Sequence, residues 1–111
     1  MHLLTANYWI RLLSSLTDED KINELKIYDR ETILLTPIII SQISNHFTNQ
    51  KNFRISNWFL DYSINTENVR IIYFSKDEHT KISTLAIEKN VSYDEASNYY
   101  INQYFGATIV R

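Results

Sequence analysis

Short apolar segments alternate along this chain with longer segments whose apolar residues recur every three to four positions. The short β-branched or apolar runs predict strands, and the longer period predicts amphipathic helices. The predicted strands cover residues 2–4, 33–35, 69–73 and 107–110. Strands separated by helical segments need crossover connections, which favour a mostly parallel sheet. We therefore expect an α/β fold, a three-layer α/β/α sandwich that residues 1–111 form as a single domain.

The helical segments carry recognisable start and stop signals. Four of them are the N-cap Thr17, the cap and first-turn proline Thr36-Pro37, and the capping boxes Ser75–Glu78 and Ser92–Glu95. Gly106 is the only glycine and follows the last helical segment, where a left-handed residue is needed. The apolar stripes contain Trp9, Leu12, Leu13 and Leu16, then Ile39, Ile40, Ile43 and Phe47, then Ile55, Trp58, Phe59 and Tyr62. Tryptophans and tyrosines on such stripes predict core packing rather than platforms for base stacking.

Composition excludes several classes of protein. The chain has no cysteine, so it has neither a disulfide framework nor a thiolate metal site. Its net charge of −2, with both signs mixed, argues against binding nucleic acid or membranes by bulk charge. The longest apolar stretch, residues 34–40, is too short to span a bilayer and is interrupted by Pro37. Since no signal peptide is visible either, we expect a cytoplasmic protein with no membrane contact.

Ligands of parallel α/β sheets bind beyond the carboxyl ends of the strands. In this chain those ends are Thr5, Thr36, Ser75 and Arg111. We therefore expect any functional site to involve this edge of the sheet.

Three segments together resemble the PIN-domain ribonucleases, especially the VapC-like toxins of toxin–antitoxin pairs. The segments are residues 3–9, residues 36–42, and residues 91–97 continuing through 105–110. In that family the first strand ends in Asp-x-Asn, a glutamate stands five residues after the proline, and an Asp-Ala pair opens the last helix. A glycine, a strand and Thr-x-Asp follow. The resemblance implies a PIN-like fold and a site for Mg²⁺ or Mn²⁺ built from clustered carboxylates.

This sequence departs from the family at most of its acidic positions. Thr5 stands at the first Asp, Gln42 at the Glu, and Glu95 at the next Asp. Arg111 stands where the family has Thr, and the sequence contains no Asp two positions further on. One altered acid therefore remains of four, and we expect no bound metal and no other cofactor.

Each candidate also has a purely structural interpretation. The candidates are Thr5 as a helix N-cap, Asn7 and Asp94 as first-turn residues, Gln42 as a surface or pocket amide, Glu95 as a capping-box residue and Arg111 as a solvated charge. Asp94 and Glu95 are adjacent on a helix, so we expect their side chains to diverge by about 100° and not to share an ion. The three histidines show no ligand spacing that would indicate a metal site.

Three functions remain open from the sequence. The first is a catalytically inactive PIN-like domain that acts by binding an antitoxin-like protein, a PIN homologue or RNA. The second is a Mg²⁺- or Mn²⁺-dependent endoribonuclease with a reduced site at Glu95, Asp94, Asn7 and Gln42. The third is an unrelated small α/β interaction module. The resemblance also implies a homodimer.

Overall fold

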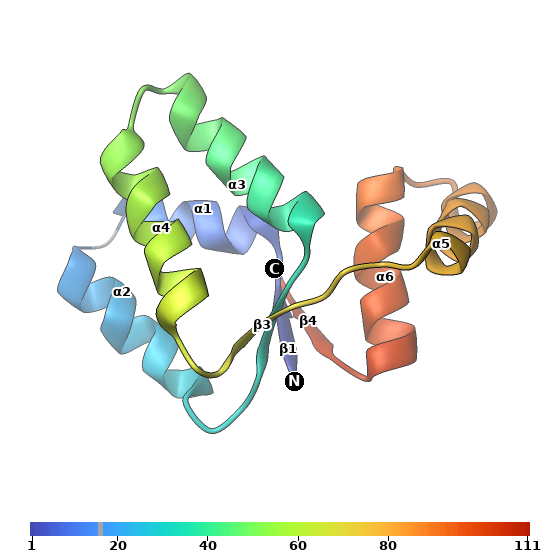
Figure 1. Ribbon diagram of the computed structural model, residues 1–111, viewed down its shortest axis with the longest axis horizontal. Helices are drawn as coiled ribbons and strands as arrows, with labels where there is room; N and C mark the ends of the chain where they lie inside the picture. Colours follow the sequence, from blue (N-terminus) through green and yellow to red (C-terminus); the bar gives the residue numbers. More distant parts are fainter. Residues whose placement is uncertain (16) are drawn as a thin grey trace.

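The computed structural model describes residues 1–15 and 17–111 and contains a parallel sheet of four strands in the order β3-β2-β1-β4 (Figure 1). The strands are β1 His2–Leu4, β2 Ile33–Leu35, β3 Val69–Ile71 and β4 Thr108–Val110. All three pairings between neighbouring strands are parallel. The expected parallel sheet is confirmed, although β3 ends two residues before the predicted boundary at residue 73.

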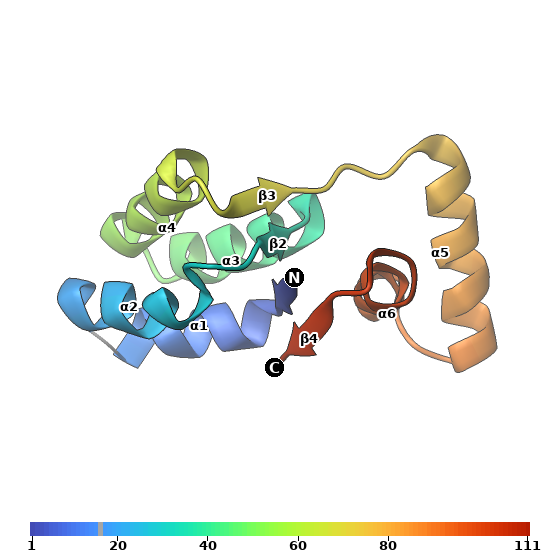
Figure 2. The same ribbon diagram turned by 90° about the horizontal axis from the view of Figure 1, so that it is seen from below.

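Helices cover both faces of the sheet, as Figure 2 shows from below. The helices are α1 Ala6–Ser15, α2 Asp18–Leu25, α3 Pro37–Asn49, α4 Phe53–Asn65, α5 Lys76–Lys89 and α6 Tyr93–Phe105, with a short 3₁₀ helix η1 at Lys26–Tyr28. Helices α1, α3 and α4 pack together on one side, while α6 contacts β1 and β4 from the other. Helix α5 packs on the outer side of α6. The three-layer sandwich expected from the sequence is confirmed.

Most of the predicted helix caps are present. The Thr36 hydroxyl accepts a hydrogen bond from the Ile39 N–H at 3.2 Å. Ser75 and Glu78 form a reciprocal capping box, with bonds of 2.9 and 3.2 Å. Gly106 ends α6 with φ of 68°, a left-handed conformation that costs glycine little.

The main core lies between the sheet and the α1–α3–α4 layer. Leu3 and Leu34 of the two central strands are fully buried, and Ile72, just after β3, is nearly so. Ile109 is only half-buried, because its strand β4 lies at the edge of the sheet. Trp58 is likewise only partly buried at the margin of the core. Leu16 of the first apolar stripe lies outside the described residues.

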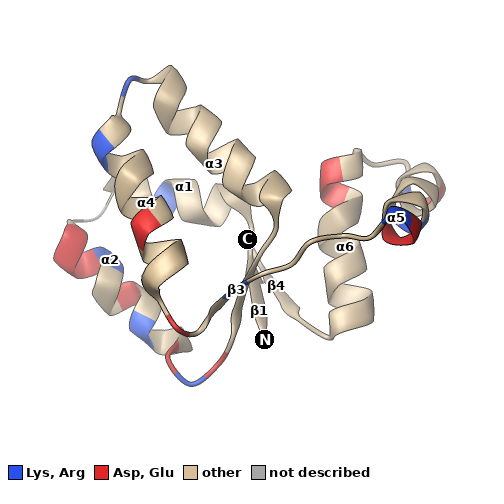
Figure 3. Cartoon of the chain, viewed as in Figure 1, with Lys and Arg blue, Asp and Glu red and all other residues tan. Residues whose placement is uncertain are grey.

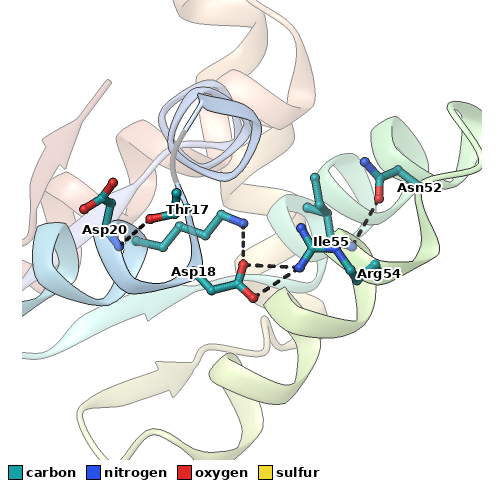
Figure 4. A network of polar contacts seen from close by, with 7 residues as sticks. Thr17, Asp18, Asp20, Asn52, Arg54 and Ile55 are labelled. Carbon is teal, nitrogen blue, oxygen red and sulfur yellow. Dashed lines mark hydrogen bonds and ion pairs between the residues drawn. The ribbon is translucent and has the colours of Figure 1, made fainter.

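A buried lysine connects the charged helix α2 to α4, which the sequence does not predict. The Lys21 side chain is 1% exposed, and its Nζ donates to Asp18 at 3.1 Å. Asp18 also pairs with Arg54 of α4 at 3.1 Å (Figure 4). The Lys21 ammonium lies 5.3 Å from the centre of the Trp58 ring, so a cation–π contact completes the junction.

A second, smaller core joins α5 to α6. It consists of the buried residues Ile82, Ala96 and Tyr100. Within the described part of the chain, no helix is long and apolar enough to cross a membrane.

Candidate functional site

A polar pocket of about 360 Å³ opens at the carboxyl ends of β1 and β4. Helices α1, α3 and α6 form its walls, so it lies where the two helical layers meet above the sheet. Its lining residues are Thr5, Ala6, Asn7, Ile10, Arg11, Gln42, Ser92, Asp94, Glu95, Asn98 and Arg111. The structure thus brings together every candidate residue named from the sequence. The other two strand ends, Thr36 and Ser75, cap helices and do not line this pocket.

The pairing of β1 with β4 fixes the floor of the pocket. Leu4 lies opposite Val110, and the Thr5 N–H donates to the Val110 carbonyl at 2.9 Å. This register places the residues that follow the two strands, Thr5 and Arg111, at the same edge of the sheet. Thr5 is 5% exposed, and its hydroxyl accepts from the Tyr8 N–H at 3.4 Å. The contact matches the N-cap role expected for Thr5.

A hydrogen bond across the pocket connects the two helical layers. Gln42 of α3 donates from Nε2 to Asp94 of α6 at 3.0 Å, although the two residues are 52 positions apart. Gln42 and Asp94 also line a neighbouring hollow, together with Pro37, Ile38, Ser41 and Asn45. Because the Gln42 amide is uncharged, this hydrogen bond leaves the Asp94 charge in place and holds its carboxylate at the rim of the pocket.

Glu95 forms an ion pair with Arg111, and the capping box expected at this helix is only half present. The Ser92 hydroxyl accepts from the Glu95 N–H at 3.1 Å, as predicted. The Glu95 carboxylate, however, pairs with the Arg111 guanidinium instead of reaching back to the Ser92 backbone. Both partners carry a charge in the carboxylate–guanidinium pair, whereas the Ser92 backbone N–H is neutral, so the guanidinium competes well for the carboxylate. Arg111 is correspondingly paired rather than simply solvated.

Both acids of this helix line the pocket, but they diverge as expected and take different partners, Gln42 for Asp94 and Arg111 for Glu95. The first turn of α6 borders the pocket. Asp94 lies on the side of the pocket that faces α3, and Glu95 lies on the side that faces the end of β4. Figure 3 shows these acidic residues together at the start of α6. The Glu95 hydrogen bond raises the pKa of Arg111.

Asn98 and Arg11 are pocket residues that the sequence reasoning missed. Asn98 is 9% exposed, and its Oδ1 is buried without a hydrogen-bond partner in the described part of the chain. It stands four residues after Asp94 and three after Glu95, a spacing that puts all three on one side of the helix. That spacing was the signal available in the sequence.

The pocket does not fit the metal ion that the fold implies. A PIN-like site needs several clustered carboxylates, whereas here Glu95 is paired with Arg111, and Thr5 and Gln42 are neutral. Nowhere in residues 1–15 and 17–111 do three or more His, Cys, Asp or Glu side chains gather so that they could hold an ion. The arrangement is a charge-balanced polar cleft rather than an acidic one.

Comparison with known proteins places the fold. No protein-family sequence profile matches this chain. Among curated proteins, none has a significantly similar sequence. Among solved structures, the chain is similar to VapC20 from Mycobacterium tuberculosis, described as a toxin that cleaves the sarcin–ricin loop. The TM-score is 0.74 at 11% sequence identity, over 96% of this chain and 85% of VapC20. This likeness confirms the PIN-like, VapC-like fold that the sequence segments indicated.

Proposed function

We propose that this chain is a PIN-like domain that acts by binding a partner and does not cleave RNA. The observation that carries the proposal is the state of the two pocket carboxylates. Glu95 is paired with the Arg111 guanidinium, and Asp94 accepts a hydrogen bond from Gln42. Metal-dependent phosphodiester cleavage needs carboxylates that are free to hold an ion.

A protein is the favoured partner, and an antitoxin-like protein or a PIN homologue would fit the resemblance. Lys and Arg are interspersed with Asp and Glu on α2 and α5 (Figure 3), and the net charge is −2. Nucleic-acid backbones are instead bound mainly by concentrated positive charge. RNA therefore remains the less favoured partner. The homodimer expected from the resemblance stays a prediction.

One observation favours a second candidate function, a metal-dependent endoribonuclease with a reduced site. Asp94 and Glu95 line the same pocket, and Glu95 stands at a position that matches a catalytic acid of the PIN-domain family. VapC20, which has a similar fold, is described as a toxin that cleaves the sarcin–ricin loop. The two candidates differ in whether the wild-type protein cuts RNA through Glu95.

The deciding experiment incubates purified protein with a structured RNA and with Mg²⁺ or Mn²⁺. We expect the wild-type protein and Glu95→Gln to leave the RNA equally intact. Glu88→Gln on α5 is the matched control, because Glu88 is exposed and does not line the pocket. Cleavage that Glu95→Gln abolishes and Glu88→Gln retains would contradict the binding function and establish the nuclease.

A further inference from the structure

Arg111 lines the pocket and forms an ion pair inside it. Its guanidinium pairs with Glu95 and lies 5.9 Å from the centre of the Tyr99 ring. The Lys89 ammonium lies 4.9 Å from the same ring. A guanidinium that contacts both a carboxylate and an aromatic ring is positioned by its surroundings, although 52% of the side chain remains exposed.

Asn98 contributes an oxygen that lacks a hydrogen-bond donor. Its Oδ1 is inaccessible to solvent and has no partner among the described residues, although the side chain lines a polar pocket. Leaving a buried carbonyl oxygen unpaired costs free energy. On the same side of α6, Asp94 and Glu95 precede it by four and three residues. Carboxylate and amide oxygens in this grouping are the donor types that hard divalent cations take.

The charges around these oxygens are balanced by arginines. The pocket is lined by two carboxylates, Asp94 and Glu95, and by two guanidinium groups, Arg11 and Arg111. Of these two arginines, Arg111 is the one that contacts a carboxylate among the residues that the structure describes. Two positive and two negative charges sum to zero, so the pocket offers a divalent ion little net attraction. Removing one guanidinium would leave a net charge of −1.

We propose that Arg111 is the resident cation of this pocket and closes a latent site for a hard divalent cation formed by Asp94, Glu95 and Asn98. The inference rests on the proposed binding function. It explains how two carboxylates can lie in this pocket when no metal ion balances their charge. The tethered guanidinium neutralises Glu95 and occupies the space beside it. The pocket then stays independent of Mg²⁺ and Mn²⁺, and the Asn98 oxygen is left without a partner.

The test is calorimetric titration of Mn²⁺ into wild-type protein, Arg111→Met and Arg111→Gln. Removing one charge close to a carboxylate should tighten Mn²⁺ binding by at least about tenfold in both variants. Arg111→Gln retains a hydrogen-bond donor for Glu95, so it guards against a loss of folding in Arg111→Met. Thermal unfolding gives a second readout, because Mn²⁺ should raise Tm in the variants but not in the wild type.

Three further variants define the site. Arg111→Lys keeps the charge and should bind Mn²⁺ no more tightly than the wild type. Arg11→Met is the matched control, because Arg11 lines the pocket without an ion pair in residues 1–15 and 17–111; its effect should be smaller than that of Arg111→Met. Adding Asn98→Ala to Arg111→Met should remove most of the gained affinity.

If folded Arg111→Met and Arg111→Gln bind Mn²⁺ no more tightly than the wild-type protein does, the proposal that Arg111 is the resident cation is wrong. This failure differs from failure of the binding function. Unchanged affinity overturns the resident cation even when the wild-type protein leaves RNA intact. Conversely, RNA cleavage by the wild type overturns the binding function even when the variants gain affinity for Mn²⁺.

Discussion

The two tryptophans lie on similar apolar stripes, yet their side chains are buried to different depths. Both fall on apolar helical stripes, which predict the side of the helix that faces the core. Trp9 is fully buried and packs edge-on against Phe59, with ring centres 5.0 Å apart. Trp58 stacks on Tyr62 at 5.4 Å and carries the Lys21 ammonium on its ring, but stays partly exposed.

Replacing the tryptophans should therefore have unequal effects on stability. We expect Trp9→Ala to lower the free energy of unfolding by about 3–5 kcal/mol, as for a large buried aromatic. Trp58→Ala should cost about 1–2 kcal/mol, because less apolar area and one cation–π contact are lost. Urea denaturation followed by circular dichroism measures both. Equal losses would show that Trp58 is as deeply buried as Trp9.

At the scale of helices and strands, the helix ends that depend on neighbouring residues were predictable from the sequence. The contacts between residues far apart in the chain were not. The cap of α3, the capping box of α5 and the glycine that ends α6 depend on neighbours within a few residues, and the structure has all of them. The capping box of α6 is incomplete because Arg111, 16 residues after Glu95, competes for the carboxylate. The burial of Lys21 likewise depends on α4, which the pattern of α2 does not contain.

The candidate site was predictable to a similar degree. The rule that ligands bind beyond strand ends located the pocket at Thr5 and Arg111. Only the three-dimensional arrangement shows which partner each polar group takes. Gln42 contacts Asp94 across 52 residues, and within residues 1–15 and 17–111 the Asn98 Oδ1 has no donor. Such pairings follow from how the helical layers meet and have no local signature.

Glu78 gives the junction between α5 and α6 a pH dependence. Its carboxylate accepts from the Ser75 backbone N–H at 2.9 Å and from the Tyr100 hydroxyl at 3.1 Å. The Ser75 backbone bond is the main cause that lowers the pKa of Glu78 below its ordinary value, although burial opposes the shift. A lowered pKa means that the stabilisation is present above the unfolded-state pKa and is lost as pH falls through the folded-state value.

We therefore expect Glu78→Ala to lower stability by about 1 kcal/mol at neutral pH, the usual cost of a lost cap. The difference from wild type should shrink once pH falls below about 4, where an ordinary Glu protonates. Glu88→Ala is the control, since Glu88 is exposed on the same helix. Denaturant melts from pH 3 to 7 give the comparison. A wild-type advantage that persists unchanged at pH 3 would contradict the role of the charge.

At the scale of the whole molecule, the described residues form two hydrophobic cores of unequal size. The large core contains the sheet and the α1–α3–α4 layer, whereas α5 is held through the small group Ile82, Ala96 and Tyr100. Figure 2 shows α5 at the end of the molecule, separated from the sheet by α6. Few buried apolar contacts make local opening less costly than global unfolding. Helix α5 should therefore open without the rest of the fold.

Amide hydrogen exchange tests this expectation directly. Amides of α5 should exchange faster than those of β1 and β2, because their opening breaks only the small core. Ile82→Ala should accelerate exchange mainly in α5, since Ile82 is fully buried in that core. Ile43→Ala, at an equally buried position of α3, should instead accelerate exchange in the slowest amides of the sheet. If Ile82→Ala accelerated exchange equally in α5 and β1, the two cores would unfold as one unit. Ile82 lies at the α5–α6 junction, so its replacement can affect exchange in the strands only through an opening that both cores share.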